Sequence, residues 1–204
     1  MGLDRSSNLL SASRRWACGL VLSLLAAVRP LPAQQMVVTV DPAATQISFT
    51  LGATMHTVHG TFQLKSGQIQ WDPATGRASG AIIIDAASGN TDNSGRDKNM
   101  HTQVLESAKF PEIVFAPMLV KGTLAKQSAS QVEVSGAIKL HGQDHSTTLN
   151  LSVQPGPGGT LLATTQFPVP FKMWGLKDPS TFLLHVADTV NLEIHASARI
   201  APVP

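Results

Sequence analysis

Cysteine is nearly absent from this sequence of 204 residues: Cys18 is the only one, and it lies in a segment that we interpret below as a removable leader. The rest of the chain can therefore form neither a disulfide nor a cysteine-ligated metal site. Its stability must come from a packed core, and about 170 residues are enough to build one.

Local catalytic motifs are also missing. The sequence contains no Gly-x-Ser-x-Gly nucleophile elbow, no glycine-rich phosphate loop with a lysine and no His-Glu-x-x-His pair. The carboxylates are scattered over turn segments, with no pair in apolar surroundings that could divide acid and base roles. We therefore expect no enzyme, no catalytic residue and no cofactor.

Histidine is the remaining candidate for metal chemistry. His56 and His59 lie three positions apart, and His141 and His145 lie four apart. Zinc requires three or four ligands in a tetrahedral arrangement, which short-spaced histidines can supply in part. The second pair brackets an expected turn, where polar residues are common. The sequence favours surface or capping histidines, and we predict no metal site.

The first 33 residues have the organisation of a secretory signal peptide. Three arginines precede an uncharged stretch over residues 16–28, and Ala33 provides a small residue at the end. The apolar stretch is shorter than the roughly 20 residues that cross a bilayer, and Arg29 interrupts it. An uncleaved membrane anchor is the alternative. We predict a leader over residues 1–33, no membrane span after its removal, and a periplasmic or secreted protein.

Removing the leader changes the charge of the chain. Four of the 15 basic residues and one of the 13 acidic residues lie in it, which leaves 11 basic and 12 acidic residues and a net charge of −1. The basic character therefore belongs to the leader, and the remaining domain shows no preference for nucleic acid.

Apolar residues in the rest of the chain recur with a period of two, in short segments separated by Gly, Pro, Asn, Asp and Ser. About eight such segments predict an all-β sandwich or barrel. The slip in the pattern at Ser66–Gly67 predicts a hairpin or a bulge. The alternating positions are Ile47, Phe49 and Leu51; Phe62 and Leu64; Ile69 and Trp71; Val132, Val134, Ile138 and Leu140; Leu149, Leu151 and Val153; Leu161, Ala163 and Phe167; and Val190, Leu192, Ile194, Ala196, Ala198 and Ile200.

One segment, residues 94–109, has helical spacing instead. Met100, Val104, Leu105 and Ala108 recur at intervals of three and four, with a cap at Asn93 or Ser94. We predict a single helix there, placed as a lid or plug beside the barrel.

Three further local features follow from the residue types. Asp97 and His101, one turn apart on the predicted helix, should form a side-chain pair. Residues 168–179 are rich in proline and glycine and predict a loop at the mouth of the barrel, whereas residues 155–159 predict a plain hairpin connection.

The inward faces carry more bulky apolar side chains than a filled sandwich requires. An eight-stranded barrel is just wide enough either to be packed with side chains or to hold one small ligand. From periodicity alone these side chains are interpreted as core filling. The bulky positions are Phe49, Phe62, Phe115, Phe167, Phe171 and Trp174.

Several motifs in a fixed order resemble one known family. Residues 96–101 read Arg-Asp-Lys-Asn-Met-His and are followed by Lys-Phe-Pro-Glu-Ile-Val-Phe at 109–115. Further agreement covers residues 41–62, 134–149 and 174–188. Together they are similar to the YceI-like family of lipid- or polyisoprenoid-binding proteins.

The resemblance implies an extended antiparallel lipocalin-like barrel over residues 34–204, with one helix and a long pore for an isoprenoid or other apolar lipid. A carrier or sequestration role follows. The alternatives are a structural or stress-related envelope protein with a filled core, and a small enzyme acting on a bound lipid or quinone. A homodimer is left open.

The resemblance implies that the inward side chains contact the ligand. His59, Lys172 and Lys177 are expected to contact a head group at the mouth, together with Trp174. Met100, Val104 and Leu105 on the helix are expected to control access. The expected pore lining comprises Phe49, Leu51, Phe62, Leu64, Ile82, Ile84, Phe115, Ile138, Leu149, Leu151, Phe167, Phe171, Trp174, Leu192 and Ile194.

Overall fold

The computed structural model describes residues 35–203, and the predicted leader lies outside the described residues. Within these residues, the segments with alternating patterns form nine strands, which are joined by turns, loops and one helical segment. The strands are β1 (Met36–Val40), β2 (Gln46–Ala53), β3 (Thr57–Trp71), β4 (Ala78–Asn90), β5 (Glu112–Lys121), β6 (Ser130–Leu140), β7 (Gln143–Pro155), β8 (Thr160–Val169) and β9 (Val186–Pro202).

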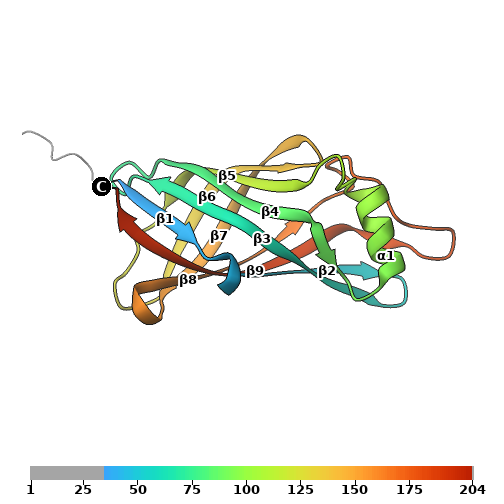
Figure 1. The fold of residues 1–204 in the computed structure, drawn as a ribbon, viewed down its shortest axis with the longest axis horizontal. Coiled ribbons are helices and arrows are strands. Elements are labelled where there is room, and N and C mark those ends of the chain that lie inside the picture. Colours follow the sequence, from blue (N-terminus) through green and yellow to red (C-terminus); the bar gives the residue numbers. More distant parts are fainter. Residues whose placement is uncertain (1–34, 204) are drawn as a thin grey trace, which may run out of the picture. The chain divides into compact units, whose positions relative to one another are not determined.

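All neighbouring strands are antiparallel, and pairing of β3 with β4 closes the sheet into a barrel (Figure 1). β1 and β2 occupy the same place between β3 and β9, one after the other. They are separated by a short 3-10 turn, η1 (Pro42–Ala44), whose first turn is capped by the Asp41 side chain. Counting β1 and β2 as one position gives the predicted eight-stranded barrel.

β3 is long enough to pair with both β2 and β1 along one side. Its residues 57–62 pair with β2, and its residues 67–71 pair with β1. On its other side, the register against β4 shifts between Leu64 and Ser66. The irregularity predicted at Ser66–Gly67 is thus a bulge within one continuous strand, and the hairpin alternative is wrong.

The helical segment starts where it was predicted and ends earlier. Helix α1 (Ser94–Asn99) is capped by Asn93, whose side chain accepts the Arg96 N–H at 2.9 Å. A π-helical turn, η2 (Met100–Val104), follows. The prediction that the helix continues to Lys109 is wrong, because Glu106 adopts a left-handed conformation (φ 46°) that reverses the chain.

The expected pairing of Asp97 with His101 is also wrong. Asp97 Oδ1 accepts hydrogen bonds from both the N–H and the hydroxyl of Thr91, at 2.9 and 2.5 Å. The His101 ring bonds through Nε2 to the Gly89 carbonyl oxygen at 2.8 Å. Both side chains thereby tie the helix to the end of β4 instead of to each other.

Two connections between strands follow the turn chemistry of their residues. β6 and β7 are joined by His141 and Gly142, both with positive φ (51° and 79°), as in a type I′ hairpin turn. The predicted connection at residues 155–159 contains a single 3-10 turn, η3 (Pro157–Gly159), before β8 begins. None of the helices among the described residues is long and apolar enough to cross a membrane.

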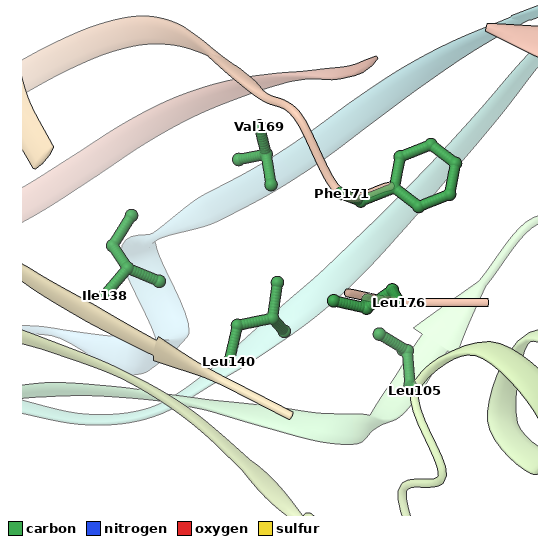
Figure 2. Packing of buried hydrophobic residues seen from close by; sticks show 6 residues of the cluster. All are labelled: Leu105, Ile138, Leu140, Val169, Phe171 and Leu176. Atoms are coloured by element: carbon green, nitrogen blue, oxygen red, sulfur yellow. The ribbon is translucent and has the colours of Figure 1, made fainter. Parts of the chain in front are cut away.

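The barrel interior is apolar along its length. One cluster, formed by Val40, Ile47, Leu64 and Ala198, lies where β1 meets β3 and β9. The other cluster lies near the helical segment, and Figure 2 shows its side chains directed toward one another. It comprises Leu105, Ile138, Leu140, Val169, Phe171 and Leu176. Phe62 and Leu192 contact both clusters.

Candidate ligand cavity

A cavity of about 630 Å³ extends through the barrel. Its lining includes Val38 and Val40 of β1 as well as Arg96 and Met100 of the helical segment, so it connects the regions of both apolar clusters. Large inward side chains such as Phe62, Phe115 and Leu192 line the cavity and are only partly buried. The inward side chains therefore surround a space instead of filling it.

Every residue expected from the sequence to line the pore does line this cavity. The alternation of each strand is responsible, since successive side chains of a strand point to opposite faces of the sheet. In β9, for example, Leu192 and Ile194 line the cavity, whereas Asn191 and Glu193 are exposed. Whether these side chains contact a ligand stays a prediction.

Phe49 and Phe62 form an aromatic pair in the cavity wall, with ring centroids 5.3 Å apart. Phe49 lies directly opposite Gly60 in the β2–β3 ladder. A Cβ atom at Gly60 would be 2.3 Å from the Phe49 ring. Because Gly60 has no side chain, the Phe49 ring can lie over this position of the neighbouring strand β3.

The helical segment contributes apolar side chains to the cavity, as predicted. Met100, Val104 and Leu105 all line it and pack against the cluster that contains Leu140 and Phe171. They lie at the end of the barrel where α1 is seen in Figure 1. Their role in controlling ligand access stays a prediction.

Sequence reasoning missed the polar part of the lining, which comprises Thr45, His56, Thr91, Arg96, Asn99, Thr165 and Thr181. Arg96 donates from Nε to the Thr91 hydroxyl and from Nη2 to the Thr91 carbonyl, each at 2.7 Å. Arg96 precedes Met100 by four residues, so both lie on one helix face. That spacing was the signal that could have identified Arg96.

Of the residues expected to contact a head group, His59, Lys172 and Lys177 do not line the cavity. His59 is exposed between the inward neighbours Val58 and Gly60, so the strand directs its side chain outward. Lys177 donates to Gln103 Oε1 at 2.6 Å and so connects the loop after β8 to the helical segment. Only Trp174, of the side chains expected at the mouth, is part of the lining.

Lys172 is occupied by a network that joins its loop to the start of β9. Its Nζ lies 2.8 Å from carboxylate oxygens of both Asp178 and Asp188, and it donates to the Val186 carbonyl at 3.1 Å. The hydrogen bond from Lys172, helped by those from Ser180, lowers the pKa of Asp178 to about 2. The same bonds, to Asp178 and then to Asp188, raise the pKa of Lys172. The lysine stabilises the loop and does not face the ligand space.

The segment after β8 closes a gap in the barrel wall. β7 and β8 pair only over residues 152–155 and 161–164. Beyond that point the Trp174 ring stacks on His145 of β7, with centroids 4.2 Å apart and planes at 2°. Phe171 and Leu176 of the same segment are buried. The segment predicted as a mouth loop is therefore partly a wall of the cavity.

The histidines considered as metal ligands are used separately. His141 Nε2 lies 2.5 Å from Glu106 Oε2 and connects the β6–β7 turn to the turn after the helix. His145 stacks on Trp174, whereas His56 lines the cavity and His59 is exposed outside it. Among residues 35–203, we find no group of three or more His, Cys, Asp or Glu side chains that could hold a metal ion.

The barrel is shared with solved structures of low sequence identity. It is similar to a polyisoprenoid binding domain from Saccharophagus degradans implicated in plant cell wall breakdown, with TM-score 0.61, 16% identity, and coverage of 80% of this chain and 98% of that one. BcnA of Burkholderia cenocepacia gives TM-score 0.61, 18% identity, and coverage of 79% and 99%. A YCEI protein of Campylobacter jejuni gives TM-score 0.56, 18% identity, and coverage of 74% and 88%.

No curated protein sequence matches the chain. The model of the YceI-like domain matches residues 38–198, which is well over half of the sequence and includes every strand from β2 to β8 in full. This match agrees with the order of motifs in the sequence and with the closed barrel, and the chain accordingly belongs to the YceI-like family.

Proposed function

We propose that the protein is an exported binding protein that holds one isoprenoid or other long-chain apolar lipid in its barrel and carries or sequesters it. The observation that supports this most strongly is the cavity of about 630 Å³, lined along the barrel by aliphatic and aromatic side chains. Its volume lies within the usual range of small-molecule sites. The similar domain from Saccharophagus degradans is a polyisoprenoid binding domain, which points to the same ligand class.

The driving force is the transfer of apolar ligand surface out of water. Each buried methylene contributes about 0.8 kcal/mol, so a five-carbon isoprene unit contributes about 4 kcal/mol before the costs of association. Few polar contacts are needed for such a ligand. The cavity is well suited to this mode, since its polar lining is confined to a few side chains.

The distribution of polar side chains orients the ligand. Thr91, Arg96 and Asn99 lie on the helical segment and the strand end before it. The region between β1 and β9 is lined by apolar residues such as Val40 and Ala198, and the Thr45 hydroxyl there already donates to the Asp41 carbonyl at 2.7 Å. A ligand with one polar end therefore binds with that end toward α1. Arg96, and not His59, Lys172 or Lys177, takes the role of the head-group contact.

The alternatives have less support. A structural protein with a filled core would bury its large inward side chains fully, which the cavity prevents. An enzyme acting on a bound lipid would need a nucleophile or a general base beside the ligand. Among residues 35–203, the ionisable side chains of the lining are His56 and Arg96, and Arg96 is held by its hydrogen bonds to Thr91.

Export is supported by the basic, apolar and small-residue regions of the first 33 residues. We propose the periplasm or the extracellular space as the place of action. There, a water-insoluble lipid would have to be shielded during passage through an aqueous compartment, which is what a closed apolar barrel provides.

The proposal is tested by placing a charge in the cavity. Phe115 lines the cavity and Ala116, the next residue of β5, is exposed. Phe115→Glu should abolish binding of cis-parinaric acid, a fluorescent long-chain probe, whereas Ala116→Glu should bind as the unmodified protein does. Circular dichroism establishes that both variants are folded. Full probe binding by folded Phe115→Glu would contradict the proposal.

A further inference from the structure

Two turns at the α1 end of the barrel expose apolar side chains almost completely. Met55, in the turn between β2 and β3, is 89% exposed, and Phe182 and Leu183, in the loop before β9, are 95% and 83% exposed. We call these three residues the apolar tips. Side chains of this size are normally at least partly covered in a soluble protein, so a cluster of them requires an explanation.

The three apolar tips occupy central positions of two tight turns. The Ala53 N–H donates to the His56 carbonyl at 2.9 Å, which places Met55 inside that turn. The Thr181 N–H donates to the Leu184 carbonyl at 2.7 Å, with Phe182 and Leu183 between them. Such positions usually carry Gly, Asn, Asp or Pro. Their apolar side chains are therefore held outward by the turns themselves.

Hydrogen bonds join the two turns into one unit. The Thr54 N–H donates to the His185 carbonyl at 2.9 Å, and the His185 N–H donates to the Thr54 hydroxyl at 3.0 Å. Met55 is next to Thr54, whereas Leu183 and Phe182 lie two and three positions before His185. The tips thus belong to one rim and not to two independent loops.

The same turns also line the cavity. Ala53 and His56 of one turn and Thr181 and Leu184 of the other are part of its lining. Figure 1 shows these turns at the same end of the barrel as α1. A ligand that leaves the cavity at this rim would emerge beside Met55, Phe182 and Leu183.

We propose that the apolar tips insert into the surface of a lipid bilayer and that the protein exchanges its ligand there; this proposal rests on the proposed function. A lipid is insoluble in water, so its exchange has to take place where the cavity meets another apolar phase. Residues 53–57 and 181–185 contain no Asp, Glu, Lys or Arg, so no formal charge has to be dehydrated when the turns insert. Aromatic and aliphatic side chains bind at the bilayer interface through their buried apolar area.

The test is co-sedimentation with vesicles of pure phosphatidylcholine. The unmodified protein should sediment with the vesicles in low and in high salt alike, because the contact is apolar. The double variant Phe182→Ser/Leu183→Ser should lower the partition coefficient by at least about tenfold. Met118→Ser is the matched control, since Met118 is 58% exposed on β5 and its loss should have no effect.

A second measurement separates this proposal from the proposed function. Binding of cis-parinaric acid delivered from cyclodextrin, without vesicles, should be equal in the unmodified protein and in the double variant. If the unmodified protein binds the probe but not vesicles, or if the double variant sediments as well as the unmodified protein, membrane docking is wrong and the binding function stands. If the probe itself is not bound, the proposed function is wrong.

The alternative partner of the apolar tips is a second copy of the chain, and analytical ultracentrifugation detects such a dimer. A dimer that is lost in Phe182→Ser/Leu183→Ser and that prevents vesicle binding would overturn membrane docking. A monomer that binds vesicles supports it.

Discussion

Ala163 of β8 and Ala196 of β9 lie directly opposite each other in the antiparallel ladder, and both line the cavity. Facing positions on one side of a sheet have Cβ atoms about 5 Å apart. These two small side chains therefore leave space where larger neighbours such as Leu192 and Phe167 reach inward. The width of the cavity at this level depends on them.

Ala163→Phe should narrow the cavity at that level. The substituted ring would occupy space that a long ligand otherwise fills, so binding of long-chain fatty acid probes should weaken by at least about tenfold, whereas short-chain probes should be bound with little change. Fluorescence titration with a series of chain lengths measures this. Thr164→Phe, on the adjacent residue outside the lining, should show no dependence on chain length. Equal weakening for all lengths would argue against a cavity that follows the barrel.

Gly60→Ala should destabilise the barrel by about 1–3 kcal/mol, because the added Cβ overlaps with the Phe49 ring and comes within 2.8 Å of the Asn90 carbonyl oxygen. Urea unfolding measures the change. Phe49→Leu removes the ring, so the double variant should lose less stability than the sum of the two single variants. Strict additivity would show that the ring and the glycine are not coupled.

Arg96→Gln should change ligand selectivity more than it changes stability. A charge-assisted hydrogen bond is worth about 1.5–3 kcal/mol, so binding of cis-parinaric acid should weaken by roughly 10-fold or more. Its methyl ester, which carries no charge, should bind with nearly unchanged affinity. Equal weakening of the acid and the ester would mean that Arg96 supports only the helix, through its bonds to Thr91.

Lys172→Met should raise the pKa of Asp178 from about 2 toward 3.8, since the Lys172 hydrogen bond is the main cause of the lowered value. A carboxyl group whose pKa is lower in the folded state than in the unfolded state stabilises the fold above the unfolded value. That contribution is lost as the pH falls from about 4 toward 2. Carboxyl carbon shifts in an NMR titration measure the pKa. Lys65→Met, which removes the pair with Glu112, is the control and should leave Asp178 unchanged.

The barrel could be predicted because each strand repeats the same inward and outward alternation, as in Leu149 and Leu151 or Leu192 and Ile194. The start of the helix was predictable to within one residue, because Asn93 and Ser94 are both typical cap residues; Asn93 is the one that caps it. Its end was not, because a left-handed Glu106 has no sequence signature and is fixed in place by His141, 35 positions away.

The polar residues of the site were harder to predict for the same reason. Lys172 looked like a head-group contact until Asp178 and Asp188 were placed beside it, and one of these comes from β9. His59 was chosen by its residue type, although the alternation of its strand directs it outward. Pairings between distant segments decide such roles, and periodicity identifies inward residues without identifying partners.

The central claim, that the barrel holds one apolar lipid, is tested most directly by native mass spectrometry of the protein purified from its own host, followed by organic extraction of what it carries. The account predicts a mass increment that matches a single isoprenoid, quinone or fatty acyl species in the extract. A protein that is empty as purified and that also takes up no added long-chain lipid would contradict it.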